Sequence, residues 1–333
     1  MTIPEAKRTL AVRHESFPIR GVFRISRGAR TVANTVVAEI ADGSVTGRGE
    51  CVPYPRYGES VEQVMADIAA MADAVAAGLD REALRRAIPP GAARNAVDCA
   101  LWDLEAKLTG VPVWQLAGLD APPEPVVTAY TISVDTPEAM AEATRAAAGK
   151  PLLKVKLSGE GDLERMHAVR AAAPSTRLIA DANEAWTRAH LEAFAPAFAD
   201  LGVEMIEQPF HEKDDDGLLG FRSPVPIGAD ESCHDRAGLE RVRGKYQVIN
   251  IKLDKTGGLT EALDLRREAL AAGFELMIGC MVGSSLAMAP AMFLAQGARF
   301  VDLDAPLLLA QDRTPALRYE GATLYPPEPD LWG

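Results

Sequence analysis

The most constraining feature of this sequence is a series of short apolar runs beyond residue 125, separated by stretches with helical periodicity. This alternation is typical of parallel α/β structure. Runs that recur about every 25 residues, eight in all, predict a (β/α)8-type barrel, whose active sites lie at the carboxyl ends of the strands. The expected strands are residues 126–132, 152–157, 177–181, 203–207, 226–230, 248–252, 275–279 and 300–304.

The part of the chain before these runs has a different pattern, which predicts an α+β domain. Strand character is found at residues 10–13, 35–40 and 47–51, around an Asp-Gly turn signal. Two amphipathic helices follow, the first introduced by a capping box at Ser60. A proline-rich linker at 121–125 then separates the domains. We therefore expect an α+β capping domain at 1–125, a catalytic barrel at 126–315, and a tail at 316–333 that packs back on the cap.

Charge and composition exclude several classes of protein. The 333 residues include 35 Lys and Arg against 47 Asp and Glu, a formal net charge of −12. An acidic chain without basic runs repels phosphate backbones and anionic lipids, so we expect no nucleic-acid and no membrane partner. Residues 1–20 lack the order of a signal peptide, which predicts a cytoplasmic location. The four cysteines form no CxxC pair, so we assign them no chemistry.

Charged residues stand at or near the carboxyl ends of six of the eight expected strands, where a plain core would carry apolar side chains. Three consecutive strands end in the carboxylates Asp181, Glu207 and Asp230. Carboxylate oxygens suit hard divalent cations such as Mg²⁺. Any one of these carboxylates alone is better explained as a loop cap, but three uncompensated charges at one barrel mouth would repel each other. Together they predict a Mg²⁺ site.

Lysines form a second group at the same edge. Lys154 and Lys156 are two residues apart on the second strand and point to the same side. Lys252 ends the sixth strand, which lies opposite the second in an eight-stranded barrel, so two amines face each other across the mouth. A lysine acts as a base near neutral pH only if desolvation or nearby cations lower its pKa from about 10.4. Neighbouring lysines, among them Lys255, and the metal would supply those cations.

The opposed lysines and the acidic eighth strand suggest a reaction. Asp302 and Asp304 lie opposite the metal strands and would bind a cationic group while the metal binds a carboxylate. One substrate carbon would then lie between Lys156 and Lys252. If one lysine removes a proton and the other returns it to the opposite face, the result is racemisation or epimerisation α to a carboxylate, through a metal-stabilised enolate.

At these residues the chain resembles the enolase superfamily, in its muconate-lactonising branch, and most closely the dipeptide epimerases that act on L-Ala-D/L-Glu. The matching motifs are Lys154-Val155-Lys156, Asp181-Ala182-Asn183, Glu207-Gln208-Pro209, Asp230-Glu231-Ser232, Asn250-Ile251-Lys252, Lys255-Thr256-Gly257-Gly258 and Asp302-Leu303-Asp304. They occur in the expected order, and the similarity covers nearly the whole chain. The resemblance implies a modified barrel, (β/α)7β, with an α+β capping domain.

The resemblance also implies a role for each residue. It implies that Lys156 and Lys252 are the acid/base pair, and that one Mg²⁺ per subunit is held by Asp181, Glu207 and Asp230. Lys154 would contact the substrate carboxylate, and Asp302 and Asp304 would bind the α-ammonium group. Asn183 and Lys255 would support these residues. In Ala-Glu epimerases an arginine of an early mobile loop holds the glutamate side chain, and residues 23–30 resemble that loop. Arg27, Arg30 or both are the candidates, and Arg30 is favoured. Arginine pairs bidentately with carboxylates, which suits an acidic second residue. Thr131 is a candidate contact for the substrate backbone.

The expected function is therefore Mg²⁺-dependent epimerisation of the C-terminal residue of a dipeptide, L-Ala-D/L-Glu above all, with a link to murein peptide recycling. The alternatives that keep the fold are a muconate-type cycloisomerase, an o-succinylbenzoate synthase and an N-acylamino-acid racemase. Asp302 and Asp304 disfavour them, because these substrates have no ammonium group. A non-catalytic binding protein would not need two opposed lysines. The family often assembles through the barrel or the cap, so the resemblance allows a homo-oligomer.

Overall fold

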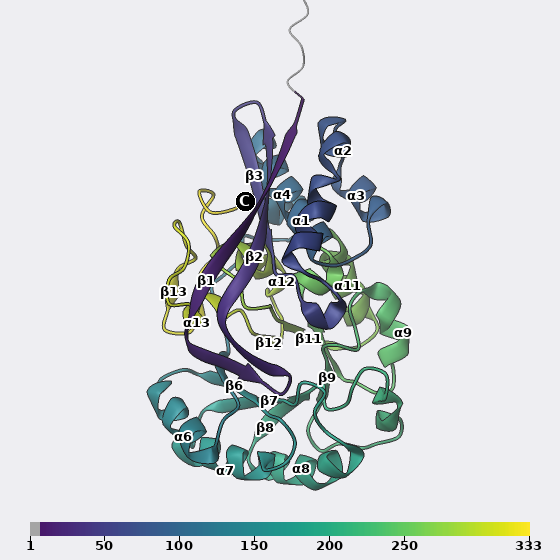
Figure 1. The fold of residues 1–333 in the computed structure, drawn as a ribbon. Coiled ribbons are helices and arrows are strands. Elements are labelled where there is room, and N and C mark those ends of the chain that lie inside the picture. Colours follow the sequence, from purple (N-terminus) through teal and green to yellow (C-terminus); the bar gives the residue numbers. More distant parts are fainter. Residues whose placement is uncertain (1–6) are drawn as a thin grey trace, which may run out of the picture.

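The computed structural model describes residues 7–333, so the first six residues of the expected capping domain, and of the segment 1–20, lie outside the described residues. A three-stranded antiparallel sheet with a group of helices stands above a barrel of parallel strands (Figure 1). Within residues 7–333 we find no helix that is long and apolar enough to cross a membrane.

The upper part is built on a sheet with the strand order β1 (Thr9–Ile25), β2 (Gly28–Asp42), β3 (Val45–Cys51). Its helices are α1 (Val61–Ala69), α2 (Ala72–Ala76), α3 (Arg81–Ala87), α4 (Ala92–Thr109) and α5 (Val113–Leu116), with the 3-10 turn η1 (Pro55–Tyr57) after β3. Helix α4 packs tightly on β3 because Gly49 has no side chain; a Cβ there would lie 2.1 Å from the Ala96 carbonyl oxygen. The left-handed Gly110 ends α4 (φ 68°).

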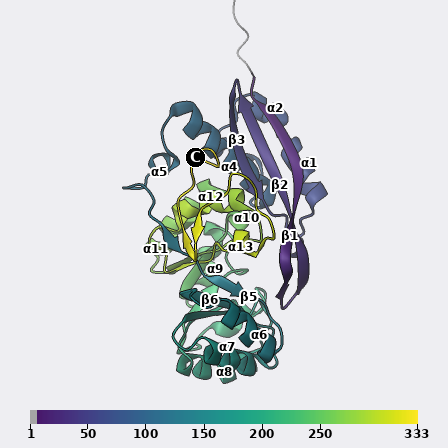
Figure 2. The same ribbon diagram turned by 90° about the vertical axis from the view of Figure 1, so that its left-hand side faces the viewer.

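The first two strands are much longer than the strands expected at residues 10–13 and 35–40. Residues 9–16 of β1 pair with residues 34–41 of β2 in the part of the sheet next to β3, whereas residues 17–25 and 28–33 form a two-stranded ribbon that reaches down to the barrel mouth (Figure 2). The expected mobile loop at 23–30 is the tip of this ribbon: Ile25 pairs with Gly28 around Ser26 and Arg27. The first ribbon strand does alternate, with Phe17, Ile19, Phe23 and Ile25 on its more buried face, but residues 28–32 of its partner are exposed and show no such alternation, so the pairing of the two was not predicted.

The barrel contains eight parallel strands in sequential order, which confirms the predicted fold class. The strands are β5 (Tyr130–Ile132), β6 (Leu152–Lys156), β7 (Arg177–Asp181), β8 (Val203–Glu207), β9 (Ile227–Ala229), β10 (Val248–Ile251), β11 (Glu275–Ile278) and β12 (Phe300–Val301). The Ala129 N–H donates to the Val301 carbonyl (2.7 Å) and joins the two edge strands. One interior layer takes a buried side chain from seven positions around the ring: Ala129, Leu152, Ile179, Met205, Val248, Met277 and Phe300.

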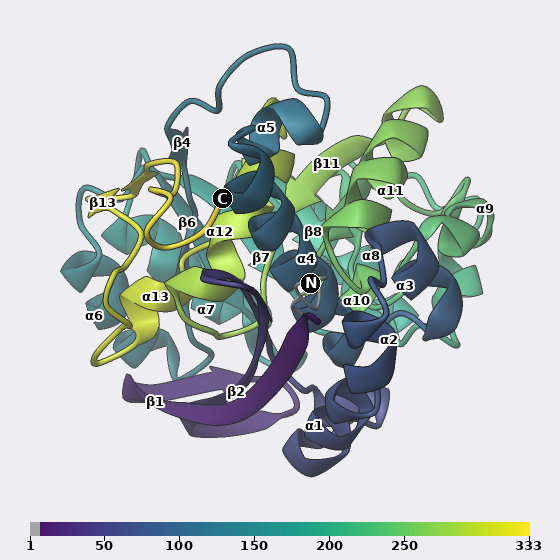
Figure 3. The same cartoon turned by 90° about the horizontal axis from the view of Figure 1, so that it is seen from above.

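Helices and short 3-10 turns surround the barrel. They are α6 (Pro137–Ala146), α7 (Asp162–Ala172), α8 (Arg188–Asp200), η2 (Asp215–Leu218), η3 (Arg236–Gly238), α9 (Leu239–Val242), α10 (Leu253–Thr256), α11 (Leu259–Ala271), α12 (Ser285–Leu294) and α13 (Ala305–Leu308). Every residue of α12 is buried. Seen from above, the β1–β2 ribbon runs along one side of the molecule and α4 lies over its middle (Figure 3).

Two predicted strands and the tail differ in detail from the expectation. The first predicted strand, 126–132, is interrupted, because β4 (Val126–Val127) pairs antiparallel with β14 (Thr323–Leu324) of the tail, itself paired with β13 (Tyr319–Glu320). The last, 300–304, ends at Val301 because α13 begins at Ala305. Near its end the tail contacts the cap, where the Trp332 indole N–H donates to the Cys99 carbonyl (3.1 Å). The domain boundaries at 125 and 315 stay a prediction.

Candidate active site

A cavity of about 430 Å³ lies between the barrel mouth and the cap. The cap contributes the ribbon tip and the turn after β3 to its wall, and the barrel contributes the carboxyl ends of its strands. Its polar lining includes Arg27, Arg30, Tyr54, Arg56, Tyr57, Lys156, Asn183, Asp230, Glu231 and Lys252, and the loop after β11 adds Cys280, Met281 and Val282. This is the edge at which the sequence predicts the active site.

The two predicted acid/base lysines line the same cavity. Lys156 ends β6 and its Nζ lies 2.6 Å from Asp181 Oδ2, while Lys252 follows β10 with its Nζ 2.6 Å from Asp230 Oδ2. Three strands separate β6 from β10 in the sheet order, so the two amines approach from opposite sides of the barrel. Each lysine is nearly buried, and its ion pair with the neighbouring carboxylate holds the ammonium in place.

The charges around Lys252 act against the lowered lysine pKa that the sequence suggested. Burial is the largest single influence and lowers the pKa, but the carboxylates, Asp230 foremost, outweigh it and raise the pKa above its usual value. Lys255 cannot counteract this, because its Nζ is itself 2.8 Å from Asp230 Oδ1 and donates to the Asp230, Cys233 and Asn250 carbonyls. Lys255 therefore ties strand ends together and does not line the cavity.

The three predicted metal ligands end neighbouring strands but do not converge as a cluster: within residues 7–333, no three or more His, Cys, Asp or Glu side chains stand close enough to hold a metal ion. The Lys154 ammonium lies between two of them, 3.2 Å from Asp181 Oδ2 and 2.8 Å from Glu207 Oε2. Asn183 supports the first through its N–H, which donates to Asp181 Oδ1 (2.9 Å), and the Asn250 amide donates to Glu207 Oε1 (2.7 Å).

The donor chemistry of these residues fits a hard cation. Glu207 Oε2 and Asp230 Oδ1 are buried oxygens that each face a lysine ammonium at 2.8 Å, Lys154 and Lys255 respectively, without the geometry of a hydrogen bond. Although burial alone would raise them, the lysines hold the pKa values of Asp181 and Asp230 below the usual range, so both are ionised. Burial and the nearby Asp181 raise the pKa of Glu207 to about 7. A set of buried carboxylate oxygens on neighbouring strand ends is the donor chemistry that Mg²⁺ prefers.

The residues predicted to contact the substrate on the first, second and eighth strands are buried and lie outside the cavity wall. Lys154, expected to contact the substrate carboxylate, is instead enclosed by carboxylates, and its Nζ is 2.8 Å from Asp302 Oδ2. Asp302 Oδ1 is buried without a hydrogen-bond partner. Asp304 precedes α13 and accepts from the Thr131 N–H (2.7 Å), and burial, followed by Asp302, raises its pKa to about 7.

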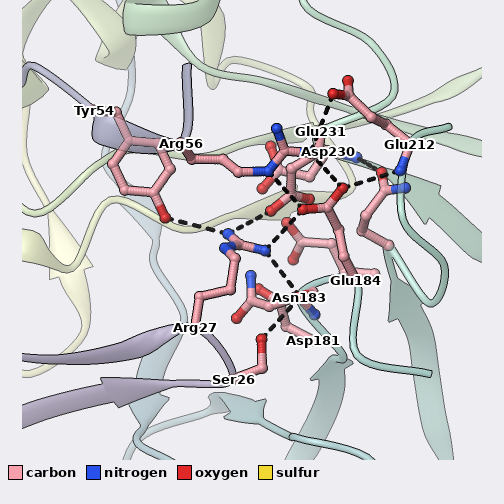
Figure 4. A network of polar contacts seen from close by, with 12 residues as sticks. Ser26, Arg27, Tyr54, Arg56, Asp181, Asn183, Glu184, Glu212, Asp230 and Glu231 are labelled. Atoms are coloured by element: carbon pink, nitrogen blue, oxygen red, sulfur yellow. Dashed lines mark hydrogen bonds and ion pairs between the residues drawn. The ribbon is translucent and has the colours of Figure 1, made fainter. Parts of the chain in front are cut away.

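Sequence reasoning missed the group that closes the cavity from above. Glu231, Glu184 and Arg56 were not singled out, yet they form with Arg27 a polar network between cap and barrel (Figure 4). Glu231 is part of the motif Asp230-Glu231-Ser232, and its place next to an expected metal ligand was the one feature of the sequence that could have indicated a role for it. The other partners come from segments without a motif of their own.

Family models match most of the chain. The enolase C-terminal domain-like model matches residues 138–328, and the mandelate racemase/muconate lactonizing enzyme N-terminal domain model matches residues 7–118. Among curated proteins, an L-Ala-D/L-Glu epimerase of Escherichia coli K12 is 48% identical over 96% of this chain and 99% of its own. An N-acetyl-D-glutamate racemase of a Pseudoalteromonas species is 46% identical over 90% of this chain and 95% of its own.

Solved structures are similar over the same length. An enolase family member from Agrobacterium tumefaciens, described as homologous to dipeptide epimerases and holding sodium and L-Ala-L-Glu with an ordered loop, is 55% identical; the match covers 98% of this chain and 100% of that one with a TM-score of 0.96. A dipeptide epimerase from Enterococcus faecalis V583, complexed with Mg and L-Leu-L-Tyr, is 30% identical over 97% and 98% of the two chains, with a TM-score of 0.90. The chain therefore belongs to the enolase superfamily, with the N- and C-terminal domains of its mandelate racemase/muconate lactonizing enzyme branch.

Proposed function

We propose that this protein is a Mg²⁺-dependent epimerase that inverts the α-carbon of the C-terminal residue of a dipeptide, with L-Ala-D/L-Glu as its substrate pair. The observation that carries the proposal is the placement of Lys156 and Lys252 in one cavity, on strands from opposite sides of the barrel. Two proton-transfer groups on opposite faces of one carbon are what inversion of that carbon requires. The similarity to epimerases over nearly the full chain supports the same function.

The chain's own residues would carry the proton transfers. One lysine takes the α-proton and the opposed lysine delivers a proton to the other face, so the configuration inverts. Asp181, Glu207 and Asp230 would hold the Mg²⁺, which when bound supplies positive charge against the charge that develops on the substrate carboxylate. Lys154 holds the deep carboxylates together, because its ammonium contacts three of them.

Arg30 is the residue we propose for the glutamate side chain. Its guanidinium stacks 5.1 Å from the Tyr54 ring centre in the cavity wall, and no carboxylate in residues 7–333 pairs with it. Arg27 is already paired with Glu184 and Glu231. Asp302, Asp304 and Thr131 are buried just outside the cavity wall in this structure, and we propose that the unpartnered Asp302 Oδ1 accepts the α-ammonium when the substrate enters, with Asp304 beside it and Thr131 near the substrate backbone.

N-acetylglutamate racemisation is a second candidate, because a relative with that name is 46% identical to this chain. It needs the same lysines and the same arginine, but an N-acylated substrate has no ammonium to place against Asp302. The two functions therefore differ at the acidic residues and agree elsewhere in the site.

The test incubates the protein and Mg²⁺ in D₂O with L-Ala-L-Glu or with N-acetyl-L-glutamate and follows deuterium at the α-carbon of glutamate. We expect exchange and inversion of the dipeptide, weakened in Arg30→Ala and in Asp302→Asn and unchanged in Arg86→Ala, an exposed arginine of α3 far from the cavity. Exchange of N-acetylglutamate alone would replace the dipeptide with the second candidate. Exchange of neither would refute both.

Three broader expectations accompany this proposal. The enzyme would work in the cytoplasm, where peptides from murein recycling would reach it. It would assemble as a homo-oligomer through the barrel or the cap. Light scattering of the purified protein measures the assembly directly, and a monomer would refute that part.

A further inference from the structure

A network of ion pairs joins the cap to the rim of the barrel, and the proposed chemistry uses none of it (Figure 4). From the cap come Arg27, at the tip of the β1–β2 ribbon, and Arg56, in the turn after β3. From the barrel rim come Glu184, after β7, and Glu231, after β9. We call these four residues the clasp.

Glu184 is the centre of the clasp. Its Oε2 accepts from Arg27 Nη1 (3.1 Å) and Arg56 Nε (3.0 Å), and its Oε1 accepts from Arg56 Nη2 (2.8 Å) and the Glu212 N–H (3.0 Å). Only 4% of the Glu184 side chain is exposed. One buried carboxylate thus holds both cap segments, and each of its oxygens accepts two hydrogen bonds.

The backbone beneath Glu184 is held in an unfavourable conformation. Asn183 and Glu184 have φ values of 43° and 66°, in the left-handed region that a glutamate rarely adopts. Such a conformation costs on the order of 1–3 kcal/mol and persists only where the surroundings enforce it. Here the Glu184 N–H donates to the Gln208 carbonyl (2.9 Å), while Ser26 Oγ and Arg27 Nη1 both donate to the Asn183 carbonyl (2.8 Å each).

The remaining arm of the clasp reaches the next loop. Arg27 Nη2 donates to Glu231 Oε1 (2.7 Å) and to the Tyr54 hydroxyl (3.2 Å). Arg27, Tyr54 and Arg56 all line the cavity, and so does the Arg30 side chain at the other end of the ribbon tip. The position of the clasp therefore sets the position of the upper cavity wall.

We propose that Glu184 is a positioning residue that fastens both cap segments over the cavity, so that Arg30 is held where the acidic side chain of the substrate must bind. This inference rests on the proposed function for its substrate and adds the means by which the cap is kept closed. Without Glu184, Arg27 keeps only Glu231 and Arg56 keeps only Glu212 as a carboxylate partner among residues 7–333, and no group is left there that holds both arginines, so loss of Glu184 loosens both segments together. Substrate binding then falls with the fraction of closed molecules.

The first test compares Glu184→Gln with Glu142→Gln, an exposed glutamate of α6 remote from the cavity. If the fraction of molecules with a closed cap falls to about one tenth of its wild-type value, KM for L-Ala-L-Glu rises about tenfold, while kcat changes by less than about twofold. Glu142→Gln should match the wild type. Glu184→Asp, which keeps the charge on a shorter side chain, should recover part of the loss. A fall in kcat at unchanged KM would overturn the proposal.

The second test needs no substrate, so it remains valid if the proposed function fails. Hydrogen–deuterium exchange of the wild type, Glu184→Gln and Arg56→Gln is followed by mass spectrometry. Amides of residues 23–30 and 54–58 should exchange faster in both variants while β6, β7 and β8 stay protected, and the double variant should add little because both changes break the same pair. Unchanged exchange at 23–30, or faster exchange throughout the barrel, would overturn the clasp.

Discussion

Asp254 offers a quantitative test of how the cap is joined to the barrel. It lies in α10, two residues after Lys252, and its Oδ1 accepts from the Val52 N–H and the Asn95 side-chain amide of the cap, both at 2.9 Å. Its side chain is buried, and burial above all, with Glu59 and Glu50 nearby, raises its pKa from 3.8 to about 7. Asp254→Asn keeps an acceptor oxygen for both donors and removes the charge.

The direction of the effect follows from proton binding. Because the pKa of Asp254 is higher in the folded state, the folded protein binds this proton more tightly than the unfolded chain, and the resulting stability is lost as pH rises from about 4 through 7. The rise of about three pH units amounts to roughly 4 kcal/mol in total. Between pH 5 and pH 8 the wild type should therefore lose on the order of 2–3 kcal/mol at this one residue. The asparagine variant should not.

The assay is urea unfolding of the wild type and Asp254→Asn at several pH values from 5 to 8. Other titrating groups affect both proteins alike, so the difference between their unfolding free energies isolates Asp254. That difference should move in favour of the variant by about 2–3 kcal/mol across the range. A difference that stays constant with pH would refute the argument, because it would mean that Asp254 is ionised in the folded protein at pH 5 already.

Three further predictions follow from the site and the fold. Lys156→Ala and Lys252→Ala should each lower epimerisation at least about 100-fold, and each should retain deuterium exchange with one diastereomer only, the opposite one in each case; NMR that finds the same diastereomer exchanging in both would contradict two opposed bases. Removal of divalent cations with EDTA should abolish epimerisation and Mg²⁺ should restore it, and calorimetric titration with Mg²⁺ alone should show weaker binding to Asp230→Asn than to the wild type. Gly49→Ala should push β3 from α4 and lower the unfolding free energy by about 2 kcal/mol, whereas an unchanged urea midpoint would mean that the two elements do not approach so closely.

The barrel could be predicted from the sequence because its signals are local. A buried parallel strand is a short apolar run, and a residue such as Glu207 at the end of one reaches the carboxyl edge whatever the rest of the chain does. The same reasoning placed Lys156 and Lys252 on opposite sides of one mouth. It failed at the β1–β2 ribbon, because the alternation of Phe17, Ile19, Phe23 and Ile25 in the first strand has no counterpart in the exposed residues 28–32 of the second.

The sequence by itself determined the barrel, the order of its charged strand ends and the family to which they point. Only the tertiary structure decided which charges pair: Lys154 is enclosed by three carboxylates, and Arg27 meets Glu231 across 204 residues of sequence while Arg30 stays unpaired within residues 7–333. The positions of the strands follow from the pattern of apolar residues, and that pattern is set by residues close together in the sequence. An ion pair follows from distance and desolvation in the folded protein, and no local pattern encodes either of these.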